Sequence, residues 1–171
     1  IHSLNDLQDI RFMGGLRKHL PITAISYLIG CITISGFLFS GFFSKEMIFK
    51  SLEENNQIVY LAGFLIVSLM TAFYMFRSYF MVFEGESRTD KIPHKTEITL
   101  DLSVFALAII VLFLGFIINS RFANFVMQSA NIVQSHLNFS LIVPVSIALV
   151  GLIPAVALYG VKNRAIKVPG L

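Results

Sequence analysis

The sequence has few charged residues and a single cysteine, and both features exclude classes of function. Only 13% of its 171 residues are Asp, Glu, Lys or Arg, whereas 56% are hydrophobic, which is not the composition of an ordinary soluble domain. Cys31 cannot form an intrachain disulfide and has no His or Cys companion at metal-ligand spacing. The sequence contains no glycine-rich phosphate loop, dinucleotide-binding fingerprint, iron–sulfur cysteine cluster or haem histidine pair. We therefore expect the chain to bind no cofactor or metal itself.

Long apolar runs take the place of such motifs. Four of them are long enough to cross a hydrocarbon core of ~30 Å: Pro21–Phe43, Ile58–Phe83, Leu102–Ser120 and Leu137–Val161. The sequence therefore predicts an all-α fold, a polytopic transmembrane helix bundle with four spans, in a bacterial cell membrane or an organellar inner or thylakoid membrane. Because the chain begins with Ile1 rather than Met, we expect it to be a piece of a longer protein.

The lysines and arginines in the turns predict how the spans are oriented. The side that holds the N-terminus has Arg11, Arg17, Lys18, Arg88, Lys91, Lys95, Lys162, Arg164 and Lys167, and the other side has Lys45, Lys50 and Arg121. Because basic turns favour the cytoplasmic side, both ends of the chain and the loop after the second span are predicted to face the cytoplasm or its organellar equivalent. Basic residues confined to such turns do not indicate nucleic-acid binding.

The runs and turns together predict the order of segments along the chain. That order is a cytoplasmic-side polar segment (1–19), a broken transmembrane helix (20–55), a transmembrane helix (56–83), a cytoplasmic-side loop (84–100), a transmembrane helix (101–120), an interfacial helix or loop (121–136), a transmembrane helix (137–161) and a cytoplasmic-side tail (162–171).

The first span is predicted to be broken. Its apolar pattern continues from Pro21 to about Leu52, which is more than 30 residues and longer than one straight span needs. Gly36 and Gly41 bracket four residues within it, and glycine permits an unwound backbone. Irregular backbone at membrane depth is tolerated only where it is buried in protein or lines a water-filled cavity. We therefore expect two half-helices joined by an unwound stretch at Gly36–Gly41.

Lys45 and Glu46 are the residues best suited to carry chemistry. An ionisable group costs roughly 2.5–3.5 kcal/mol at the centre of a transmembrane helix, so it usually marks an ion or proton pathway. Desolvation disfavours the charged form of a lysine, which would let Lys45 take up and release a proton near physiological pH. The alternative is a lysine at the end of a span that reaches the surface. Glu46 points about 100° away around the helix and is better placed for Lys50, most simply as a surface ion pair.

Arg77 is a possible secondary site, because it is the one charged residue within Ile58–Phe83. It lies about 9 Å of helix rise from Phe83. An arginine at that depth reaches the membrane interface, so snorkelling is the simpler interpretation of Arg77.

Several motifs resemble one family. The runs Gln8–Lys18, Ser40–Glu46, Met70–Arg77 and Phe83–Gly85 resemble, in order and at similar separations, the antiporter-like subunits of respiratory complex I (NADH–quinone oxidoreductase), above all subunit L, also called subunit 5. Ser40–Glu46 is similar to that family's Gly-Phe-(Phe/Trp/Tyr)-Ser-Lys-(Asp/Glu) signature. The family has one or two prolines in the break, and this chain has Gly36–Gly41 without a proline.

The resemblance implies that the chain is roughly the C-terminal third of a proton-translocating membrane subunit, with Lys45 and Glu46 facing a hydrated axis. It also implies that the partners are other membrane subunits, and that NADH, FMN, iron–sulfur clusters and quinone are bound by partner subunits. Two related identities stay open, the large subunit of a multisubunit sodium/proton antiporter and a membrane hydrogenase subunit. A passive membrane anchor is a further alternative, and it predicts a freely exposed Lys45.

Overall fold

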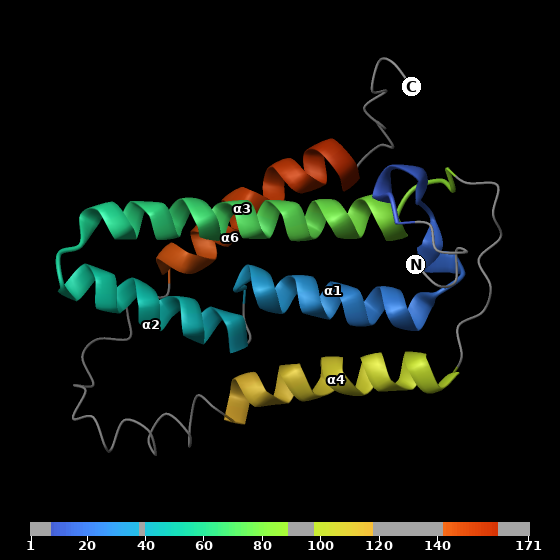
Figure 1. Cartoon of the computed structure of the whole chain (residues 1–171), viewed down its shortest axis with the longest axis horizontal. Helices are drawn as coiled ribbons and strands as arrows, with labels where there is room; N and C mark the ends of the chain where they lie inside the picture. Colours follow the sequence, from blue (N-terminus) through green and yellow to red (C-terminus); the bar gives the residue numbers. More distant parts are fainter. Residues whose placement is uncertain (1–7, 38–39, 89–97, 118–141, 161–171) are drawn as a thin grey trace.

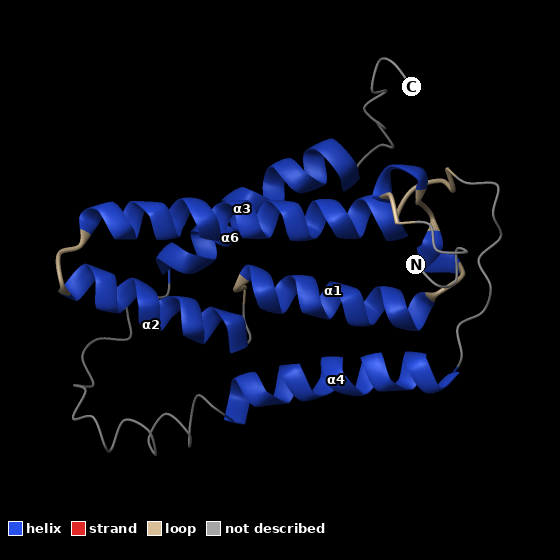
Figure 2. Cartoon of the chain, in the orientation of Figure 1, coloured by secondary structure: helices blue, strands red, loops and turns tan. Residues whose placement is uncertain are grey.

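The computed structural model describes residues 8–37, 40–88, 98–117 and 142–160, and every element in these ranges is helical (Figure 2). The elements are the 3-10 turns η2 (Ile10–Phe12) and η3 (Leu16–Lys18), the helices α1 (Pro21–Ser35), α2 (Ser40–Glu54), α3 (Ile58–Phe83), α4 (Ile98–Ile117) and α6 (Ile142–Ala155), and a π-helical turn η5 (Val156–Gly160). The predicted all-α helix bundle is thus confirmed. The predicted interfacial segment 121–136 and tail 162–171 lie outside the described residues.

Helix α3 runs along the whole bundle, and α1 and α2 lie end to end beside it (Figure 1). Helix α4 packs on the side of α1 and α2 that faces away from α3, while α6 crosses α3. The crossing is close because Gly151 has no side chain: a Cβ there would lie 2.6 Å from the carbonyl oxygen of Leu69 and 2.9 Å from the Cβ of Ala72. Small residues at such crossings let transmembrane helices approach each other.

The described helices match the predicted span lengths only in part, since α3 covers Ile58–Phe83 as predicted and the other apolar helices are shorter than a span. Among the described residues α3 alone is long and apolar enough to cross a membrane unaided, with 26 residues and a rise of about 39 Å. Shorter apolar helices cover Pro21–Ser35, Ile98–Leu114 and Val145–Gly160. Only 11% of the most apolar window of α3 is buried inside the chain. Apolar faces that point outward in this way suit a bundle surrounded by lipid or by other membrane helices.

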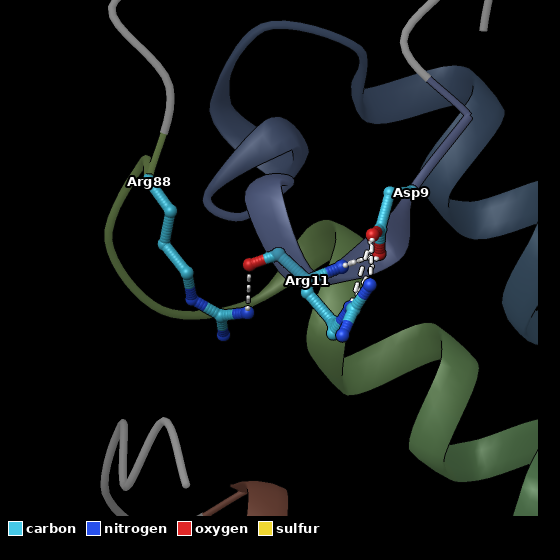
Figure 3. A network of polar contacts seen from close by, with 3 residues as sticks. All are labelled: Asp9, Arg11 and Arg88. Atoms are coloured by element: carbon cyan, nitrogen blue, oxygen red, sulfur yellow. Dashed lines mark hydrogen bonds and ion pairs between the residues drawn. The ribbon is translucent and has the colours of Figure 1, made fainter. Parts of the chain in front are cut away.

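Polar contacts gather the N-terminal segment and the end of α3 at one end of the bundle. The backbone N–H of Gly15 donates to the carbonyl oxygen of Glu84 at 3.1 Å, and Arg17 pairs with the Glu84 carboxylate at 2.7 Å. In Figure 3 the Arg88 guanidinium reaches the carbonyl oxygen of Arg11, at 3.3 Å. These contacts agree with the prediction that both segments lie on the same side of the membrane.

The Arg11 side chain is itself fixed by a carboxylate. Arg11 donates from its side chain and its backbone N–H to Asp9 (Figure 3), and these hydrogen bonds lower the pKa of Asp9 below its usual range. Asp9 is also the N-cap of η2. The ion pair is exposed, so its effect is on local order rather than on global stability.

The third predicted span begins earlier than expected. Helix α4 starts at Ile98 rather than at residue 101. Asp101 therefore lies in the first turn of α4, where a carboxylate is favoured by the helix dipole, and it accepts a hydrogen bond from Thr23 of α1 at 2.8 Å. Asp101 thus links α4 to α1.

Candidate functional site

The first half of the broken helix, α1, ends at a glycine. Gly36 has a φ of +84°, in the left-handed region that favours glycine, and its N–H donates to the carbonyl oxygen of Thr33 at 3.2 Å. The N–H of Phe37 donates to Ile32 at 3.3 Å, so the end of α1 uses the carbonyls of Ile32 and Thr33 for its own capping. The carbonyl of Ser35 is left for another donor. The predicted break is confirmed at Gly36.

Gly41 has a different role from the one predicted. Because α2 begins at Ser40, Gly41 lies in the first turn of the second half-helix and not in the unwound stretch. A Cβ at Gly41 would collide with the carbonyl oxygen of Thr33. Gly41 therefore lets the two half-helices touch, while Gly36 ends the first of them in a left-handed conformation.

Lys45 reaches back from α2 to the end of α1. Its ammonium nitrogen Nζ donates to the carbonyl oxygen of Ser35 at 3.1 Å. Its side chain lies along Gly36, since a Cβ there would be 3.0 Å from Cδ and 3.6 Å from Nζ of Lys45. The C-terminal end of a helix carries partial negative charge, which stabilises a cation placed there. The ammonium is thus held inside the break, and the freely exposed lysine expected of a passive anchor is not what the structure places here.

Glu46 is more buried than the simple surface-pair interpretation implies. It is 6% exposed, and its Oε1 lies 2.9 Å from Nζ of Lys50, whose side chain is 32% exposed. The two groups form an ion pair, and no further hydrogen bond to this buried oxygen is found among the described residues. The structure brings Glu46 together with Lys50, and Lys45 together with Ser35.

Arg77 does not join this site. Its guanidinium lies over the ring of Tyr159 in η5, with Cζ 5.5 Å from the ring centroid, and its buried Nε has no hydrogen-bond partner within the part of the chain that the structure describes. A cation over an aromatic face is attracted by the ring. This contact links α3 to η5.

Three residues at these contacts are not among the predicted site residues: Ser35, Thr33 and Tyr159. Ser35 and Lys45 are ten positions apart on two helices separated by a break, so no helical periodicity links them. The one available signal was that Ser35 immediately precedes the glycine predicted to end the first half-helix.

Comparison with known proteins relates this sequence to a family. The profile described as "NADH:quinone oxidoreductase/Mrp antiporter, TM" matches residues 1–71, which include the break, Lys45 and Glu46. Chain 5 of the NAD(P)H-quinone oxidoreductase of Picosynechococcus sp. is 51% identical over 82 residues, 47% of this chain. The NADH-quinone oxidoreductase subunit L of Campylobacter jejuni is 38% identical over 124 residues, 71% of this chain. This chain belongs to the antiporter-like membrane family that this profile describes. The predicted resemblance to subunit L, or subunit 5, is confirmed.

The similarity to this family extends beyond the matched profile. The chloroplastic subunit 5 of the NAD(P)H-quinone oxidoreductase of Chara vulgaris is 31% identical over an alignment that covers 97% of this chain. The chain spans 12% of the length of the Picosynechococcus relative, 21% of the Campylobacter one and 29% of the Chara one. With its outward-facing apolar helices, this antiporter-like chain is an integral membrane protein.

Proposed function

We propose that this chain forms part of a proton-translocating membrane subunit of a complex I-type NADH–quinone oxidoreductase, and that Lys45 is its proton carrier. The observation that carries the proposal is the hydrogen bond from Nζ of Lys45 to the Ser35 carbonyl inside the broken helix. A lysine held at the end of a half-helix is stabilised as a cation by the α1 dipole. A small shift between the two half-helices would change that stabilisation and so release or capture a proton.

Glu46 would complete the proton path. Its buried carboxylate, paired with Lys50, is suited to tune the field at Lys45 or to receive its proton. Arg77, stacked on Tyr159, is a possible secondary site whose charge adds to the field between α3 and η5. No redox step is assigned to this chain: it would respond to redox events elsewhere in the assembly.

The proposal includes the partners and cofactors of the assembly. Relatives named as subunits of NADH-quinone and NAD(P)H-quinone oxidoreductases support other membrane subunits as neighbours of this chain. NADH, FMN, iron–sulfur clusters and quinone would be bound by partner subunits. The outward apolar faces of α3 and α4 are suited to contact these subunits or lipid.

A second candidate is a sodium/proton antiporter subunit, because the matched family description also names the Mrp antiporter. The two functions differ in their need for sodium and for quinone. Proton movement driven by quinone reduction in sodium-free buffer supports the oxidoreductase subunit, and proton movement driven only by a sodium gradient supports the antiporter.

The experiment that tests the proposal replaces Lys45 in the intact assembly, after its assembly has been verified. Lys45→Ala removes the proton carrier and should abolish most of the pumping that depends on this subunit. Lys45→Arg keeps the positive charge but cannot release a proton near neutral pH, and it should fail in the same way. Wild-type pumping in both variants overturns the proposal that Lys45 is the proton carrier.

A further inference from the structure

Ser35 has a buried hydroxyl that the site described above does not use. Ser35 is 1% exposed, and its Oγ has no hydrogen-bond partner among the described residues. The carbonyl of the same residue holds the ammonium of Lys45. Buried hydroxyls are nearly always hydrogen-bonded, so this hydroxyl is available to a partner that the described residues do not supply.

A lysine that takes up and releases a proton needs different partners in its two forms. The ammonium form is donor-only, with three N–H groups and no acceptor, and a carbonyl oxygen suits it. The neutral amine has a lone pair, which a carbonyl cannot satisfy and which a hydroxyl can, because a serine O–H donates as well as accepts. Ser35 carries both kinds of group: its carbonyl oxygen accepts from this nitrogen, and its buried hydroxyl can donate.

We propose that Ser35 is a positioning residue for Lys45: its carbonyl oxygen holds the protonated lysine, and its hydroxyl donates to the neutral amine. The inference rests on the proposed function of Lys45 and adds a residue that selects between its two protonation states. Since both groups belong to one residue, the lysine keeps its place in the break when its proton leaves.

Other ionisable groups lie on α2 and on the elements packed against it, and those of α2 include Glu53 and Glu54 at its C-terminal end. On α2 itself Glu46 pairs with Lys50, and on α1 Cys31 donates to the Met75 carbonyl and Tyr27 contacts Ser78. The remaining groups on neighbouring elements are Tyr60, Tyr74, Arg77 and Tyr79 on α3, Asp101 on α4 and Tyr159 on η5; residues 142–155 of α6 have none.

The charged groups in that set lie at a distance from the break or stack elsewhere. Asp101 bonds to Thr23 near the start of α1, which is twelve residues, or about 18 Å of helix rise, from Ser35. Arg77 lies over Tyr159. Among the described residues, the Ser35 carbonyl oxygen is thus the group that accepts a hydrogen bond from the Lys45 nitrogen.

The test compares Ser35→Ala with Ser26→Ala in the assembled complex. Ser26 is a matched control on the same helix, since it is 4% exposed and its Oγ donates to the carbonyl of Ile22 at 2.9 Å. The measured quantity is the ratio of protons moved to quinone reduced, as a function of pH. Without the hydroxyl the neutral amine is less stable, so Lys45 keeps its proton to higher pH. The low-pH limb of the Ser35→Ala profile should move to higher pH by roughly 0.5–1 unit, while the Ser26→Ala profile stays in place.

The other results decide against the inference. A Ser35→Ala profile that coincides with wild type, moves to lower pH, or moves together with that of Ser26→Ala overturns it. If Ser35→Ala does not assemble, Ser35→Cys replaces it in the test. A thiol is a weaker donor than a hydroxyl, so the Ser35→Cys profile should move to higher pH by less than the roughly 0.5–1 unit expected of Ser35→Ala. If the Lys45→Ala complex keeps the wild-type number of protons per quinone, the proposed function is overturned as well. If that number falls in Lys45→Ala but the pH profile of Ser35→Ala is unshifted, only the role of Ser35 is overturned.

Discussion

Gly41, in the first turn of α2, lies against the carbonyl oxygen of Thr33 in the last turn of α1 so closely that no side chain fits between them. The two halves of the broken helix therefore touch backbone to backbone at this point. The same approach sets the distance across which Lys45 reaches Ser35. The lysine site thus depends on a glycine that takes no part in any proton transfer.

A Gly41→Ala substitution should consequently loosen the break. The added Cβ forces the half-helices apart at a cost of roughly 1–3 kcal/mol, and the assembled complex should lose thermal stability. Gly30→Ala on α1 is the matched control, because a Cβ at Gly30 meets nothing within 4 Å. Equal melting temperatures for the two variants would contradict the close contact.

Gly36→Ala should impair pumping more than it impairs assembly. Alanine is disfavoured at a φ of +84°, by roughly 1–2 kcal/mol, and its Cβ would lie 3.0 Å from Cδ of Lys45. Both effects displace the lysine from the Ser35 carbonyl. The proton-to-quinone ratio of Gly36→Ala should fall, while that of Gly63→Ala, whose Cβ would also meet nothing within 4 Å, should equal wild type. A normal ratio in Gly36→Ala would show that the position of Lys45 along Gly36 is unimportant.

The hydrogen bond from Thr23 to Asp101 should couple α1 to α4. Hydrogen bonds to a charged group contribute roughly 1.5–3 kcal/mol, so Thr23→Val and Asp101→Asn should each lower thermal stability. Together they should lower it by less than the sum, as a double-mutant cycle reveals. Ser103→Ala is the control on α4, because Ser103 bonds to the Thr99 carbonyl of its own helix. Additive losses would mean that the two side chains do not interact in the assembly.

The orientation in the membrane can be tested by labelling. Residues 84–88 pack against the N-terminal segment, and the basic turns predict that both face the cytoplasm. An impermeant thiol reagent should therefore label Ser87→Cys only from the cytoplasmic side. Gln57→Cys, in the turn between α2 and α3 at the other end of the bundle, should be labelled only from the opposite side. Native Cys31 is buried and should stay unlabelled; the reverse pattern would invert the topology.

The sequence was sufficient for the features that depend on local chemistry. The apolar runs predicted the helices, the glycine at position 36 predicted the break, and the Glu46-to-Lys50 spacing predicted an ion pair. Contacts between elements could not be predicted from the sequence in this way. The Ser35 partner of Lys45 lies across the break, and Tyr159 meets Arg77 only because α6 crosses α3, so neither contact leaves a periodic trace in the sequence.

The role of Gly41 shows the same limit. Two glycines near a charged residue indicate a flexible stretch, but sequence alone does not distinguish a glycine needed for its backbone angle from one needed for its small size. The structure separates them, since Gly36 has a positive φ and Gly41 is part of a helix.

The central claim is that Lys45 carries the proton, and its most direct test is the proton-to-quinone ratio of the assembled Lys45→Ala complex in sealed vesicles. Quinone reduction and vesicle acidification are measured in the same sample, with Lys50→Ala as the control for loss of a nearby lysine. The expected result is continued quinone reduction with a reduced number of protons per quinone in Lys45→Ala, and a smaller effect in Lys50→Ala. A wild-type ratio in Lys45→Ala would contradict the claim and make Lys45 a structural lysine that fastens α2 to the end of α1.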